Sequence, residues 1–186
     1  MCSGPRGHAA TMSSRWRREE RLTRKIVGRG ARRGNSAPSR AGDVLRRPLV
    51  WGVMASAIAL TGRRGRRAAL RGATCAAVAS LLHLPLKHAI RRPRPRGARL
   101  LGSPLMTSSF PSGHTASDLS FVFGASSEAP SLFIPLSAAT VASHWSLIRA
   151  RKHYPSDVVA GGALALAVTA ASWKLRPPAS AGGPPR

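Results

Sequence analysis

The sequence predicts an all-α protein: a small bundle of about five transmembrane helices that follows a disordered basic arm. Hydrophobic residues make up 43% of the 186 residues, too large a share for a wholly disordered basic chain. They gather in five almost uncharged runs of about 13 to 19 residues, at or below the ~20 residues that span the hydrocarbon core of a bilayer. The chain has only two cysteines, Cys2 and Cys75, so a disulfide framework is not the source of its stability.

The N-terminal arm is the most basic part of the chain. Residues 1–47 carry 13 of the 30 Lys and Arg side chains and show little apolar periodicity. Because such a stretch cannot bury a core, we expect residues 1–42 to form a largely disordered arm. The alternative is a short basic helix around Ser14–Val27, with Trp16 as an anchor at the membrane interface.

The five apolar runs come next, and each is expected to be a helix. They cover residues 48–62, 68–86, 115–127, 131–148 and 158–173. Pro111, Pro130 and Pro155 fall at or near their boundaries, where a missing backbone N–H costs little. Helices of a soluble domain are the alternative, but five such runs would leave almost no polar face toward water. We therefore expect residues 43–176 to form the membrane domain and residues 177–186 a flexible tail.

A formal charge of +24 is typical of proteins that bind nucleic acid or an anionic membrane surface. The apolar runs favour the membrane, so membrane lipids are the expected partners and nucleic acid is not. A basic nucleic-acid-binding protein is the competing class; it would be extracted by high salt without detergent. If all five runs cross, one side of the membrane collects 22 of the 30 Lys and Arg residues, and the positive-inside rule places that side in the cytoplasm.

Three polar clusters lie between the apolar runs, in residues 87–95, 111–114 and 153–157. All three meet on one side of the bundle if every run crosses the membrane. Cations, two histidines and a carboxylate at one membrane face indicate a phosphate site. Arg offers a planar fork that matches phosphate oxygens, and Lys a compact charge. Ser112 and Gly113 precede the third helix, where a hydroxyl and a backbone N–H meet an anion at the positive helix end.

The two histidines suggest divided roles. A neutral imidazole can attack phosphorus when a carboxylate holds its other nitrogen, and His153 with Asp157, four residues later, fits that arrangement. His114 would then be the acid that protonates the leaving alkoxide. Only six carboxylates occur in the chain, so we expect no metal site and no metal-assisted transfer.

These clusters resemble the three motifs of the type 2 phosphatidic acid phosphatase (PAP2) superfamily. Its first motif, Lys, six residues and Arg-Pro, is matched by Lys87, Arg94 and Pro95. The second, Pro-Ser-Gly-His, is matched by Pro111, Ser112, Gly113 and His114. The third, Ser-Arg, five residues, His, three residues and Asp, is matched by Ser146, His153 and Asp157. The resemblance covers roughly residues 43–175.

The resemblance implies a membrane-embedded phosphatase that works without a metal or other cofactor. It makes His153 the nucleophile that forms a phosphohistidine, Asp157 its orienting partner and His114 the general acid. Phosphate binding is assigned to Lys87, Arg94, Ser112 and Gly113. The implied substrate is a lipid phosphate of the phosphatidic acid or polyprenyl phosphate type. The excess of Arg over Lys, 26 to 4, indicates a high-GC bacterial gene, and in that setting decaprenylphosphoryl-5-phosphoribose is a further candidate. The implied location is the cell membrane, with several crossings.

One position departs from the third motif, because Leu147 stands where the family has Arg. Losing such a contact to the transition state typically costs ~10²–10³ in rate. Arg149, four residues before His153, or Arg151 is the candidate replacement. The alternative function is a catalytically impaired protein that binds a lipid phosphate. His144, inside the fourth run, is interpreted as a hydrogen-bonded helix contact.

Overall fold

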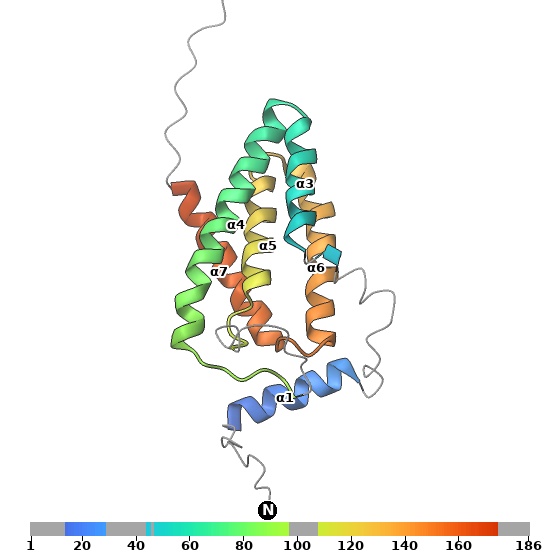
Figure 1. Ribbon diagram of the computed structural model, residues 1–186, viewed down its shortest axis with the longest axis vertical. Helices are drawn as coiled ribbons and strands as arrows, with labels where there is room; N and C mark the ends of the chain where they lie inside the picture. Colours follow the sequence, from blue (N-terminus) through green and yellow to red (C-terminus); the bar gives the residue numbers. More distant parts are fainter. Residues whose placement is uncertain (1–13, 29–43, 46, 97–107, 175–186) are drawn as a thin grey trace, which may run out of the picture.

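The computed structural model of the chain describes residues 14–28, 44–45, 47–96 and 108–174. All regular structure in these residues is helical, which confirms the predicted fold class. Five helices run along the long axis of the molecule, and the sixth, α1, lies across one end of them (Figure 1). The bundle helices are α3 (Pro48–Leu60), α4 (Arg63–Ala89), α5 (Gly113–Ser126), α6 (Phe133–Arg149) and α7 (Pro155–Lys174), with a 3-10 turn, η2 (Pro130–Leu132), before α6.

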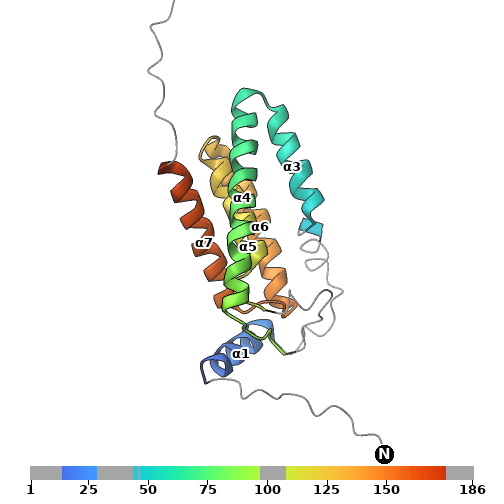
Figure 2. The same ribbon diagram turned by 60° about the vertical axis from the view of Figure 1, so that its left-hand side comes forward.

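The predicted helix positions hold, with one change at the start of the second run. Helix α4 begins at Arg63, five residues before the apolar run from which we predicted it. Its first turn is therefore basic, and the chain turns at Gly62, whose φ of 103° favours glycine. Helices α3 and α4 form an antiparallel hairpin around this turn (Figure 2).

Three of the helical segments are long and apolar enough to cross a membrane: Arg63–Ala89, Pro130–Arg149 and Pro155–Lys174. We expected five crossings. Helices α3, with 13 residues, and α5, with 14 residues, are shorter than the ~20 residues that a spanning helix needs. Helix α5 is instead the centre of the bundle, with eight buried residues. It packs against α4, α6 and α7.

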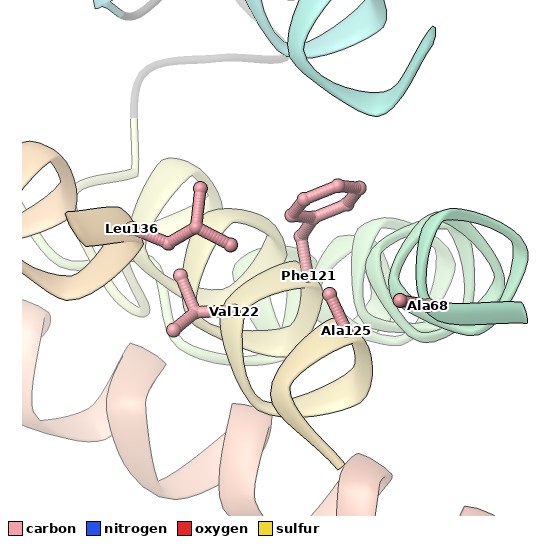
Figure 3. Close-up of a cluster of buried hydrophobic side chains, with 5 residues drawn as sticks. All are labelled: Ala68, Phe121, Val122, Ala125 and Leu136. Atoms are coloured by element: carbon pink, nitrogen blue, oxygen red, sulfur yellow. The ribbon is translucent and has the colours of Figure 1, made fainter. Parts of the chain in front are cut away.

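The bundle is held together by close packing around α5. One core cluster joins Ala68 of α4, Phe121, Val122 and Ala125 of α5, and Leu136 of α6 (Figure 3). Small residues let the backbones approach: a Cβ on Gly72 would lie 3.0 Å from the carbonyl oxygen of Phe121. Such contacts are the main attraction between helices in lipid, where hydrophobic burial adds little.

Part of the arm that we expected to be largely disordered is helical. Helix α1 spans Ser14–Val27, the bounds of the alternative weighed from the sequence. The physical reason is tertiary: Glu20, Thr23 and Val27 share one face of α1 and are buried. The rest of the arm and the expected flexible tail of residues 177–186 lie outside the described residues.

Candidate active site

The three polar clusters meet at the end of the bundle where α4 ends and α5 and α7 begin (Figure 1). Backbone hydrogen bonds join them directly. The Ser109 N–H donates to the Arg92 carbonyl at 2.9 Å, and the Ser112 N–H donates to the Asp157 carbonyl at 3.0 Å. The first cluster is thereby tied to the segment that leads into the second, and the second to the third.

His153 is placed by the way α6 ends. The Lys152 N–H donates to the Leu147 carbonyl and the Arg151 N–H to the Ile148 carbonyl, the pair of bonds of a Schellman cap. Arg151 takes the left-handed conformation of that cap, with φ of 55°. The cap turns the chain back under the bundle, where the His153 side chain is 3% exposed.

The tautomer of His153 follows from its hydrogen bond. Its Nδ1 lies 2.8 Å from the carbonyl oxygen of Ser109, and a carbonyl can only accept, so Nδ1 carries the proton. The lone pair of the neutral ring is then on Nε2. Burial lowers the pKa of His153, and the charge of Arg94 lowers it further, while Asp157 and the bond to Ser109 oppose the shift. Burial and the charge of Arg94 therefore favour the neutral imidazole that a nucleophile needs.

Asp157 lies in the first turn of α7, which begins at Pro155, a position where proline suits a helix. One carboxylate oxygen, Oδ2, accepts the Tyr154 N–H at 2.8 Å and lies 3.7 Å from His153 Nδ1. The other, Oδ1, accepts from Arg92 Nη1 at 2.8 Å. The Ser109 carbonyl is therefore nearer to the imidazole than Asp157 is, and the carboxylate supports the ring through its charge.

The two predicted phosphate-binding cations lie beside this pair. Lys87, in the last turn of α4, is buried and close enough to Arg94 and Asp157 for charge interactions. Arg94 donates from Nη1 to the Lys152 carbonyl at 2.7 Å, which ties the first cluster to the residue before His153. Burial lowers the pKa of Arg94, and Asp157 opposes that shift.

The second cluster forms the start of α5. Ser112 is its N-cap: the Oγ accepts the Thr115 N–H at 3.4 Å and the Thr115 hydroxyl at 2.9 Å. It is fully buried, so the structure gives its side chain a capping role, and its predicted phosphate contact stays a prediction. A Cβ on Gly113 would lie 2.6 Å from His83 Nε2, so this glycine makes room for an imidazole. His114 follows and is exposed.

Leu147, which stands where the third motif has Arg, lies inside the bundle and is 1% exposed. Arg149 is half-buried at the last residue of α6, and Arg151 donates from Nη1 to the Arg96 carbonyl at 3.2 Å. His144 contacts Asp118 of α5 at 3.2 Å, with both side chains buried, which confirms the interpretation of His144 as a helix contact.

Sequence reasoning missed Arg92 and His83 as neighbours of the site. Arg92 lies between Lys87 and Arg94 in a run of cations, and no pattern tells which of them turns inward. His83 precedes Lys87 by four residues, so helical spacing alone places both on one face of α4. That spacing is the signal that could have identified it.

Comparisons with known proteins identify the family and a structure of similar fold. The sequence model of the PAP2 superfamily matches residues 68–180. Among solved structures, the crystal structure of a transmembrane PAP2-type phosphatidylglycerolphosphate phosphatase from Bacillus subtilis is similar in fold, with a TM-score of 0.63 and 17% sequence identity, over 90% of each chain. No curated protein sequence shows significant similarity to the chain.

Proposed function

Because the chain belongs to the PAP2 superfamily, we propose that it is a membrane-embedded phosphatase that removes the phosphoryl group of a lipid phosphate without a metal. The observation that carries the proposal is the tautomer of His153. Its Nδ1–H is held by the Ser109 carbonyl, so the lone pair on Nε2 is free of a proton and suited to attack phosphorus. An exposed surface histidine would have no such constraint.

The proposed reaction has two steps. Nε2 of His153 bonds to phosphorus as the ester oxygen leaves, and His114 gives that oxygen its proton. The imidazolium part of the phosphohistidine is stabilised by the negative charge of Asp157 and by the Ser109 carbonyl. His114 then takes a proton from a water molecule as the water oxygen attacks phosphorus, and the N–P bond breaks to release inorganic phosphate and regenerate neutral His153.

Lys87 and Arg94, with the Gly113 N–H and the Ser112 hydroxyl, are proposed to hold the phosphoryl oxygens. Helix α5 begins at Gly113, so its first N–H groups have no partner inside the helix and add positive potential. The three candidate spans support a substrate whose tail stays in the bilayer while its phosphate reaches the end of the bundle. Phosphatidic acid and polyprenyl phosphates, including decaprenylphosphoryl-5-phosphoribose, have this form.

The direct test is phosphate release by the purified full chain from a panel of lipid phosphates, including phosphatidylglycerophosphate, with and without EDTA. We expect release that EDTA leaves unchanged and that His153→Ala abolishes. His88→Ala is the control, because His88 is an exposed histidine in the last turn of α4, at the same end of the bundle. A strict requirement for an added divalent cation would contradict the mechanism.

Leu147 favours a second candidate function, a protein that binds a lipid phosphate with little turnover. A buried leucine replaces a guanidinium that the family uses on phosphate. Comparing the wild type with Leu147→Arg separates the two. Under the leading proposal the wild type releases phosphate and the variant releases it at an equal or higher rate. Binding of lipid phosphate by the wild type without release would support the second candidate.

A further inference from the structure

Helix α1 lies across the end of the bundle that holds the candidate site (Figures 1 and 2). It contacts α6 and α7, the two helices that flank His153. Two adjacent acidic residues, Glu19 and Glu20, lie in its middle, and all other charged residues of the helix are basic. Glu20 is 4% exposed, so this carboxylate faces the bundle rather than water.

Glu20 joins two loops through one carboxylate: residues 90–96 after α4 and residues 150–154 between α6 and α7, here called the catalytic loops. Its Oε2 accepts the Tyr154 hydroxyl at 3.3 Å and the Arg96 backbone N–H at 3.2 Å. Its Oε1 accepts from Arg24 at 3.1 Å. Burial and Glu20 raise the pKa of Tyr154 to about 12, so the hydroxyl keeps its proton and remains a donor at every working pH.

Arg92 is the second link between α1 and the site. Its Nη1 donates to Asp157 Oδ1 at 2.8 Å and to Ser156 Oγ at 2.7 Å, and its Nη2 lies 3.7 Å from Glu19 Oε2. The guanidinium also lies over the Tyr154 ring, 4.2 Å from the ring centroid. A planar, permanently charged group can make all these contacts at once, which an ammonium cannot.

The charge pattern argues that these contacts are specific. The described part of the chain holds five carboxylates. Four of them pair with arginines, namely Glu19, Glu20, Glu128 and Asp157, and Asp118 contacts His144. Asp157 and the two carboxylates of α1 all lie at the site end. The chain has a net charge of +24, so a helix on its surface would be soluble without acidic residues. The presence of Glu19 and Glu20 in α1 therefore requires another explanation.

We propose that α1 is a positioning element of the active site, in which Glu20 joins the two catalytic loops and the charge of Glu19 stabilises Arg92 where it orients the Asp157 carboxylate toward His153. This inference rests on the proposed phosphatase function. With Oδ1 held by Arg92 and Oδ2 by the Tyr154 N–H, the carboxylate cannot rotate away from the imidazole. Glu19 offsets the positive charge of Arg92, so that Asp157 keeps its negative potential at the ring.

The test uses the full chain with Arg92→Gln, Arg92→Lys and Glu20→Gln, and measures kcat, KM and the pH profile with a lipid phosphate. A loosened carboxylate lowers kcat and leaves KM nearly unchanged, because substrate contacts are intact. We expect a fall in kcat of about 100-fold for Arg92→Gln and about tenfold for Glu20→Gln, since misplacing a catalytic group by ~1 Å costs on this scale. Arg92→Lys should retain part of the kcat that Arg92→Gln loses. Loss of the positive charge in Arg92→Gln moves the acid limb of the pH profile upward.

Glu128→Gln is the matched control, because Glu128 pairs with Arg71 at 3.3 Å at the opposite end of the bundle. It should leave kcat and the pH profile as in the wild type. Wild-type kcat in Arg92→Gln and Glu20→Gln would overturn the proposal, and so would an equal loss in Glu128→Gln.

A second readout separates this proposal from the proposed function. If the wild type releases no phosphate from any lipid, the phosphatase assignment fails, and hydrogen exchange still tests the role of α1. We expect amides of residues 90–96 and 153–157 to exchange at least tenfold faster in Glu20→Gln than in Glu128→Gln. Equal exchange in the two variants would show that α1 does not hold the loops.

Discussion

Two arginine–carboxylate pairs lie at opposite ends of the bundle, and under the proposed function they have different roles. At the far end, Arg71 of α4 contacts Glu128 at 3.3 Å and donates to the Ser172 carbonyl of α7 at 3.1 Å. At the site end, Arg92 contacts Asp157 at 2.8 Å. Arg71 joins α4 to Glu128, which follows α5, and to the last turn of α7. Arg92 lies in a loop, and its carboxylate partner has an imidazole on its other side. What lies beyond the carboxylate decides whether such a pair only stabilises the fold or also prepares a reaction.

The largest expected difference between the two ends is in catalysis. Asp157→Asn removes the charge that stabilises the imidazolium, and we expect kcat to fall on the order of 10⁴-fold, as for other carboxylates that support a histidine. Arg71→Gln should lower the free energy of unfolding by about 1–3 kcal/mol and leave kcat unchanged. Steady-state kinetics and thermal unfolding of both variants measure the contrast. A loss of kcat in Arg71→Gln as large as in Asp157→Asn would show that the two ends of the bundle do not differ in their effect on catalysis.

Close backbone contacts sharpen the comparison. A Cβ on Gly161 of α7 would lie 2.6 Å from the Ser112 carbonyl oxygen, whereas one on Gly72 would lie 3.0 Å from that of Phe121. We expect both Gly→Ala variants to lose about 1–3 kcal/mol of stability from overpacking. Only Gly161→Ala should also lower kcat, by roughly tenfold or more, because it displaces the segment that bonds to Asp157. Equal kcat in the two variants would contradict the assignment of Ser112 to the site.

The pH profile tests the environment of His153. Because burial lowers its pKa, the neutral nucleophile persists below the ordinary value, and kcat/KM should reach half its maximum below about pH 6.5. Asp157 raises this pKa, so the residual activity of Asp157→Asn should have its acid limb at still lower pH. The unfolded chain binds this proton more readily, so His153 also contributes stability that is lost as pH falls below about 6.5. An acid limb above pH 7 would exclude His153 as the titrating group.

The smallest effect concerns the two turns with positive φ. The far end uses Gly62, with φ of 103°, and the site end uses Arg151, with φ of 55°. Arg151→Gly should raise the free energy of unfolding by about 1 kcal/mol, because glycine takes a positive φ without strain. The lost hydrogen bond to the Arg96 carbonyl reduces this gain slightly. Gly62→Ala should lower it by about 1–2 kcal/mol. Thermal unfolding in detergent measures both, and opposite signs are the expected result.

Most of the fold and much of the site could be predicted from local patterns. The lengths of the apolar runs predicted the five bundle helices, because a helix needs only contiguous apolar residues to form in lipid. The order of the polar clusters placed Lys87, Arg94, Ser112, His153 and Asp157 at one end, since two crossings bring the chain back to the same side. The number of crossings stays a prediction: three of the described helical segments are long and apolar enough to span a membrane, and α3 and α5 are shorter.

The sequence by itself determined the helices, the end of the bundle where the polar clusters gather, and the family resemblance, since each depends on residues close together in the chain. Only the tertiary structure decided that Ser109 holds the His153 proton, that Arg92 is the cation on Asp157, and that α1 docks against the site. These depend on pairs such as Tyr154 with Glu20, 134 residues apart, whose distance no local pattern contains. Any of several neighbouring arginines could pair with Asp157 at nearly equal energy. The packed backbone decides that Arg92 does so.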